Sequence, residues 1–215
     1  MDAVTTQKTL KVSRGFTYTY YVSPARDSKP TLLLTHGFPD NAHEWSDLIA
    51  TYLVPAGYGV VAPDLLGYSG TSKPLDPAAF GWKLMAADLI EILDAEKIPK
   101  IIALGHDFGS TMAQSVYNLY PSRTIGLVMV NVTYKAPSDD DFDLDKVLAM
   151  TTKVFGYGLL WYWKFFSADD AAEKINADLP RFFDMLHGTR DTWLATVCRD
   201  GGAREGMEGK LAVEV

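Results

Sequence analysis

Hydrophobic and polar positions over the first 135 residues follow strand and helix periods in turn. Alternation over residues 8–12 and 16–22, with Ser13-Arg14-Gly15 between them, predicts a β-hairpin. Continuous apolar runs predict buried strands of a parallel sheet at residues 31–35, 59–63, 101–104 and 125–132. Helical spacing predicts helices at residues 44–53, 81–95 and 108–120. Strands that alternate with helices predict an α/β fold class: a three-layer domain around a mostly parallel sheet.

The pattern changes after Tyr134. An acidic run covers residues 138–145, and residues 146–187 are rich in aromatic side chains at helical spacing. The alternation of strands with helices does not return. We therefore place a boundary near Ala136, with an α/β core over residues 1–135 and a helical lobe over residues 136–215.

Composition and charge narrow the classes of partner. The formal net charge is −7 and no basic stripe offsets it, which argues against a nucleic-acid partner. The single cysteine, Cys198, excludes an internal disulfide framework and fits a reducing compartment. The N-terminus has neither a basic start nor an apolar run, and no window reaches a membrane-spanning length. These features predict a soluble cytoplasmic enzyme without a membrane partner.

The most informative motif is Gly105-His106-Asp107-Phe108-Gly109. It follows an apolar strand and precedes an amphipathic helix, which is the setting of a nucleophile elbow. The glycines permit a sharp turn and close packing, so the central side chain projects into a site. An aspartate there can attack carbon and form an ester, a chemistry suited to epoxides or alkyl halides.

A second motif, His36-Gly37-Phe38-Pro39-Asp40, follows the strand at residues 31–35. It sits at the carboxyl edge of the sheet, where open α/β sheets bind ligands. Because Gly37 lets the backbone come close, the Phe38 N–H can face a developing oxyanion, with the Phe108 N–H as a second donor. The alternative interpretation is an ordinary turn at a strand end.

The two motifs, with Pro63-Asp64-Leu65-Leu66-Gly67-Tyr68-Ser69-Gly70-Thr71-Ser72 between them, resemble the epoxide hydrolase branch of the α/β-hydrolase fold family. The resemblance implies that Asp107 opens the ring as nucleophile and that the Phe38 and Phe108 N–H groups form the oxyanion hole. It also implies that two tyrosines of a helical cap hold the epoxide oxygen. Tyr162, in an aromatic segment similar to the first cap helix, is the candidate, and Tyr157 is its competitor.

One part of the family pattern is missing from this sequence. The family uses a histidine to activate water and an acid to orient it, both after further core strands. Of the four histidines, His36 and His106 belong to the motifs, while His43 and His187 follow no core strand. We therefore expect the N-terminal part of an enzyme, with an incomplete core, an incomplete cap and crippled ester hydrolysis.

The resulting interpretation is an epoxide hydrolase-like enzyme that adds water to a small apolar or aromatic epoxide. It implies no cofactor and no metal ion, and assembly as a homodimer is left open. A haloalkane dehalogenase is the enzymatic alternative, although Phe38 and Phe108 offer no side-chain N–H to a departing halide. The other alternative is a truncated, non-catalytic fragment that binds small ligands.

Overall fold

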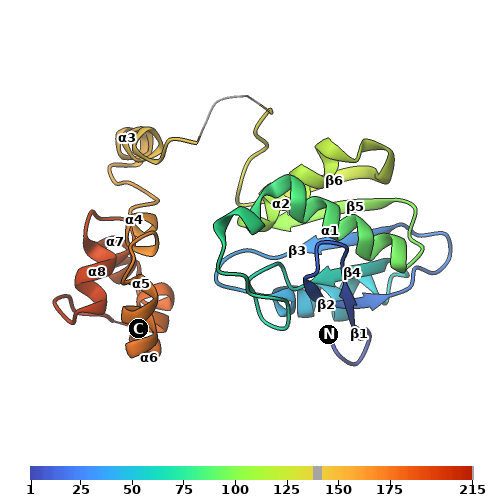
Figure 1. The fold of residues 1–215 in the computed structure, drawn as a ribbon, viewed down its shortest axis with the longest axis horizontal. Helices are drawn as coiled ribbons and strands as arrows, with labels where there is room; N and C mark the ends of the chain where they lie inside the picture. Colours follow the sequence, from blue (N-terminus) through green and yellow to red (C-terminus); the bar gives the residue numbers. More distant parts are fainter. Residues whose placement is uncertain (138–141, 215) are drawn as a thin grey trace. The chain divides into compact units, whose positions relative to one another are not determined.

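The structure, a computed structural model, describes residues 1–137 and 142–214. The chain divides into two compact units, Met1–Pro137 and Ser138–Val215. The first unit contains every strand of the described residues, and the second is helical (Figure 1). Part of the acidic run, residues 138–141, lies outside the described residues.

The first unit is built on a six-stranded mixed sheet in the order β1-β2-β4-β3-β5-β6. The strands β4, β3, β5 and β6 run parallel, whereas β2 is antiparallel to both of its neighbours. The hairpin and the mostly parallel sheet predicted from the sequence are therefore confirmed. The strand bounds are β1 Thr6–Lys11, β2 Thr17–Ser23, β3 Thr31–Thr35, β4 Gly59–Pro63, β5 Ile101–His106 and β6 Thr124–Val130.

Helical elements cover both faces of this sheet. On one face, α1 (Trp82–Ala95) packs against α2 (Phe108–Leu119), and α2 lies over β3, β5 and β6 (Figure 1). On the other face lie η1 (Ala42–Trp45) and η2 (Leu48–Leu53). Two short 3₁₀ turns, η3 (Pro77–Phe80) and η4 (Pro121–Arg123), precede α1 and β6.

Alternation along β3 divides the core between these two faces. Leu33 belongs to the cluster beneath α1 and α2, whereas Leu32 and Leu34 belong to the cluster with Trp45 and Ile49. All three leucines are buried, as expected for a central strand covered on both sides. The sheet thus forms the middle layer of three.

The segment predicted as a helix at residues 44–53 is helical, but it does not form one regular α-helix. The segment forms a 3₁₀ turn, η1, followed by a π-helical stretch, η2, in which Val54 N–H donates to Ile49 O. Asn41 caps η1 by accepting from His43 N–H, and Ala42 N–H donates to the carboxylate of Asp64. These contacts hold the start of the segment, and Ile49 is fully buried within η2.

The prediction that residues 125–132 form a buried strand is only half right. β6 forms, but it lies at the edge of the sheet and pairs with β5 alone among the described strands. Ile125, Val128 and Val130 are each more than two-fifths exposed. An apolar run cannot distinguish an edge strand from a central one, because position in a sheet is a property of the whole fold.

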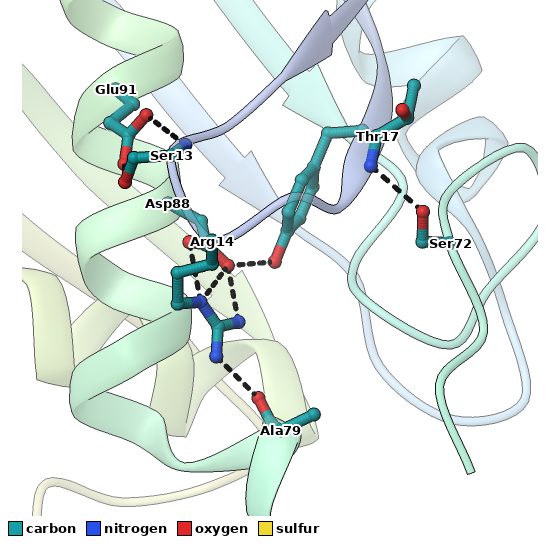
Figure 2. A network of polar contacts seen from close by, with 8 residues as sticks. Ser13, Arg14, Thr17, Ser72, Ala79, Asp88 and Glu91 are labelled. Atoms are coloured by element: carbon teal, nitrogen blue, oxygen red, sulfur yellow. Dashed lines mark hydrogen bonds and ion pairs between the residues drawn. The ribbon is translucent and has the colours of Figure 1, made fainter. Parts of the chain in front are cut away.

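A buried ion pair fastens the β1–β2 hairpin to α1 (Figure 2). Arg14, in the hairpin turn, donates to both carboxylate oxygens of Asp88, which is fully buried on α1. The hydroxyl of Tyr18 donates to the same carboxylate at 2.8 Å, and the third guanidinium nitrogen of Arg14, Nη1, donates to Ala79 O. Every oxygen of the buried carboxylate is therefore hydrogen-bonded, as a buried charge requires.

The second unit consists of short helices around an aromatic core. They are α3 Leu144–Phe155, α4 Tyr162–Phe166, α5 Ala171–Ala177, α6 Leu179–His187, α7 Arg190–Thr196 and α8 Gly202–Met207. Asp143, Asp178 and Thr189 cap three of these helices by accepting backbone N–H bonds. Phe165, Met185 and Met207 form the centre of the core.

Candidate active site

The register of two central strands brings the two sequence motifs together. β3 and β5 run parallel with Thr35 opposite Gly105, the last pair of their ladder. The chain therefore leaves the sheet with His36 beside His106 and Gly37 beside Asp107. Sequence positions about seventy residues apart meet at the carboxyl edge of the sheet, as predicted for ligand sites in open α/β folds.

Asp107 occupies a strained turn between β5 and α2. Its backbone has φ 52° and ψ −125°, a left-handed φ that non-glycine residues adopt rarely. A Cβ on Gly105 would lie 2.1 Å from Gly109 O, and one on Gly109 would lie 1.9 Å from Thr35 O. Neither position can hold a side chain, so the two glycines let strand and helix close on each other and aim Asp107 outward.

Two hydroxyl groups brace this turn from below. Thr35 Oγ donates to Gly109 O at 2.8 Å, and Ser110 Oγ donates to Gly105 O at 2.7 Å. Both side chains are fully buried. These hydroxyls donate hydrogen bonds to backbone carbonyl groups at the turn, for which the irregular backbone offers no N–H partner.

The loop after β3 lies against the carboxylate of Asp107. Phe38 N–H donates to Asp107 Oδ1 at 3.3 Å. A Cβ on Gly37 would lie 2.5 Å from Asp107 Cβ and 2.9 Å from His106 O, so only glycine fits between loop and elbow. The Phe38–Pro39 peptide bond is cis. Phe108 begins α2, which places its N–H in the first turn of that helix, next to Asp107.

His36 is a structural residue rather than a base. It is fully buried, its Nδ1 faces Gly37 O at 2.9 Å, and its Nε2 accepts from Leu65 N–H at 2.9 Å. This pattern requires a neutral ring with the proton on Nδ1. Burial lowers the pKa of His36, and the Gly37 carbonyl offsets this only in part. The imidazole thus fixes the loop after β3 to the loop after β4.

Glu44 spans the loop and the elbow. Its Oε2 accepts from Gly37 N–H at 3.2 Å, and its Oε1 lies against Nδ1 of His106, a contact that is an ion pair only when the imidazole is protonated. Burial raises the pKa of Glu44, while the Gly37 N–H and the charge of His106 act in the opposite direction. The sequence analysis missed this residue, since it placed Glu44 at the start of a helix and gave it no role.

The remaining candidates lie in the second unit. Tyr162 begins α4, half-buried, with its ring edge-on to Phe166 at a centroid distance of 5.2 Å. Tyr157 is half-buried between α3 and α4, with its ring 6.4 Å from that of Phe155. His187 ends α6 and stacks on Phe183. A role for either tyrosine in catalysis stays a prediction.

Asp107 lies in a strained turn between a strand and a helix, and a backbone N–H contacts its carboxylate. This arrangement defines an α/β protein with an aspartate at the position of the nucleophile elbow. The chain belongs to the alpha/beta hydrolase fold family, whose model matches residues 30–194. Within that family it falls in the epoxide hydrolase branch.

Three relatives illustrate this placement. Epoxide hydrolase B of Mycobacterium tuberculosis is 30% identical over 173 residues, which cover 73% of this chain and 46% of the relative. Bifunctional epoxide hydrolase 2 of Mus musculus is 32% identical over 165 residues, which cover 76% and 28%. The crystal structure of epoxide hydrolase A from Mycobacterium thermoresistibile matches with a TM-score of 0.72 at 24% identity, over 92% of this chain and 60% of that one. The chain thus spans less than half the length of these two curated relatives.

Neither a metal-binding cluster nor a membrane-spanning helix is present in the described residues. No group of three or more His, Cys, Asp or Glu side chains is arranged to hold a metal ion in residues 1–137 and 142–214. Across the same residues, no helix has the length and apolar character needed to cross a membrane.

Proposed function

We propose that Asp107 is the nucleophile of an epoxide hydrolase reaction, in which water is added to an epoxide to give a vicinal diol. The observation that carries the proposal is the 3.3 Å contact from Phe38 N–H to Asp107 Oδ1 on a turn with φ 52°. The bond orients one carboxylate oxygen toward the loop and leaves the other to attack. The names of the relatives, all epoxide hydrolases, support this substrate class.

The chemistry follows from the two carboxylate oxygens. Oδ2 of Asp107 attacks a ring carbon, the carbon–oxygen bond of the epoxide breaks, and an ester and an alkoxide form. We assign to Tyr162 the phenol that gives the alkoxide its proton. Water then attacks Cγ of the ester, and the negative charge develops on Oδ1. That atom faces the Phe38 N–H, with the Phe108 N–H as second donor. Collapse of this tetrahedral intermediate breaks the bond to the substrate oxygen, restores the Asp107 carboxylate and releases the diol, while one proton of the water goes to the substrate oxygen and the other returns to the Tyr162 phenolate.

Ester hydrolysis needs a base that takes a proton from the water. In the first unit, His36 is buried and bonded on both nitrogens, and His43 pairs with Asp2. His106 faces Glu44. These contacts hold the three imidazoles of the first unit in other roles, so we propose that the first unit supplies no base for this step and that ester hydrolysis is slower than ester formation unless His187 acts as the base. Loss of the base from a cooperative catalytic unit lowers turnover by orders of magnitude.

Intact-protein mass spectrometry with styrene oxide, run beside a diol assay, tests this function. The wild-type chain should gain the mass of one epoxide, with little diol, and Asp107→Ala should gain none. Sustained diol formation would overturn the proposal of slow hydrolysis. A protein that is folded by circular dichroism yet forms neither ester nor diol would contradict the enzymatic function and favour a small-ligand-binding fragment.

The haloalkane alternative uses the same nucleophile and differs in its leaving group. Phe38 and Phe108 carry no side-chain N–H, but the indole of Trp82 stacks on Phe108 with ring centroids 6.3 Å apart. An indole therefore packs against the side chain that follows Asp107, which is the one observation in favour of the alternative. Bromide release from bromoalkanes separates the two reactions: the epoxide proposal expects none.

A further inference from the structure

We propose that Glu44 is a positioning residue that joins the loop after β3 to the elbow, and so holds the Phe38 N–H on the Asp107 carboxylate. The proposal rests on the proposed function and adds a residue to its machinery. Glu44 touches neither reacting atom. It acts through Gly37, which precedes the donor Phe38, and through His106, which precedes the nucleophile Asp107.

The contacts of the Glu44 carboxylate support this role. One oxygen accepts the Gly37 N–H at 3.2 Å, and Gly37 is bonded to Phe38, which supplies the donor. The other oxygen pairs with His106, which is bonded to Asp107. A single side chain, 16% exposed, therefore contacts both the residue before the donor and the residue before the nucleophile.

Packing leaves the loop little freedom once it is fixed. Gly37 lies so close to the elbow that an added Cβ would overlap Asp107 and His106 O. The Phe38–Asp107 hydrogen bond is already long at 3.3 Å, and a small shift of the loop would break it. The position of Gly37 thus decides whether the donor reaches the carboxylate.

The charge of Glu44 argues against the view that this residue serves only to stabilise the fold. Because burial raises the pKa of its carboxyl, the folded chain holds the proton more tightly than the unfolded chain does. The ionised form therefore lowers folding stability as pH rises through the raised pKa. Asp40 acts in the same direction, whereas His106 and the Gly37 N–H oppose it. A charge that lowers stability is consistent with a role in the site.

Three variants test the proposal. Glu44→Ala removes both contacts, and Glu44→Gln keeps an acceptor for Gly37 N–H without the charge. Asp40→Asn is the control, since it removes a neighbouring charge from the same loop and leaves both contacts in place. With styrene oxide, ester formation should slow by about ten-fold in Glu44→Ala, recover in part in Glu44→Gln and stay near wild type in Asp40→Asn. Equal rates in all four proteins would overturn the proposal.

Amide NMR tests the same role without any reaction. The Gly37 amide resonance should titrate with Glu44 in the wild type and in Asp40→Asn, and lose that titration in Glu44→Gln. The Phe38 amide, which donates to Asp107, should change its chemical shift in Glu44→Ala and keep it in Asp40→Asn. Failure of the amides to respond would overturn the positioning role even if ester forms. Conversely, if wild type forms no ester while the amides respond, the proposed function fails and the link through Glu44 stands. Circular dichroism of each variant shows that it is folded.

Discussion

Removal of the Asp88 carboxylate should separate the β1–β2 hairpin from α1. Asp88→Ala leaves the guanidinium of Arg14 and the hydroxyl of Tyr18 without the acceptor that both share (Figure 2). Loss of one partner from a buried ion pair costs about 3–5 kcal/mol. Since Arg14 keeps 19% of its side chain exposed and can reach water, we expect the lower end of that range, about 3 kcal/mol. Asp88→Asn keeps one oxygen acceptor and should cost about half as much.

Urea unfolding followed by circular dichroism measures the loss, and hydrogen exchange of residues 8–22 locates it in the hairpin. Glu91→Ala is the matched control. Glu91 also lies on α1 and binds the hairpin turn through Ser13, but at the surface, so its loss should cost about 1 kcal/mol or less. If Asp88→Ala and Glu91→Ala lower stability equally, the buried ion pair does not fasten the hairpin as described.

Three further changes probe the elbow, the buried imidazole and the cap. Gly109→Ala should lower the melting temperature and abolish ester formation, because its Cβ would lie 1.9 Å from a backbone oxygen. Gly126→Ala should do neither, because its Cβ would lie 3.7 Å from the Ile102 side chain, an ordinary contact distance. Burial lowers the pKa of His36, so the unfolded chain binds its proton more readily and stability should fall as pH drops through about 6.5. Urea midpoints measured against pH should show that fall, and His36→Asn should reduce its slope. Tyr162→Phe should slow ester formation by about 10²-fold and Tyr157→Phe should not, and the reverse order in intact-mass time courses would assign the phenol to Tyr157.

The elbow could be predicted from the sequence because its determinants are local. Gly105, Asp107 and Gly109 stand within five residues, and the strand before them and the helix after them have clear periods. The structure adds the backbone angles and the close approach to Thr35. The strands of the parallel sheet were predictable for the same reason, since each is a short apolar run.

The parts that could not be predicted depend on contacts between distant segments. Glu44 gains its place from Gly37 and His106, and no local pattern marks such a carboxylate. The π-helical geometry of η2 is likewise not marked by its hydrophobic spacing, which fits an α-helix equally well. The exposure of β6 depends on its place in the strand order, which apolar runs do not encode.

The most direct test of the central claim is to locate the adduct formed with styrene oxide. Peptide mapping of the acid-quenched protein should place a single ester on Asp107, out of 27 aspartate and glutamate residues. It should be absent from Asp107→Ala. An adduct spread over several carboxylates, or centred on another residue, would contradict the account of Asp107 as the nucleophile.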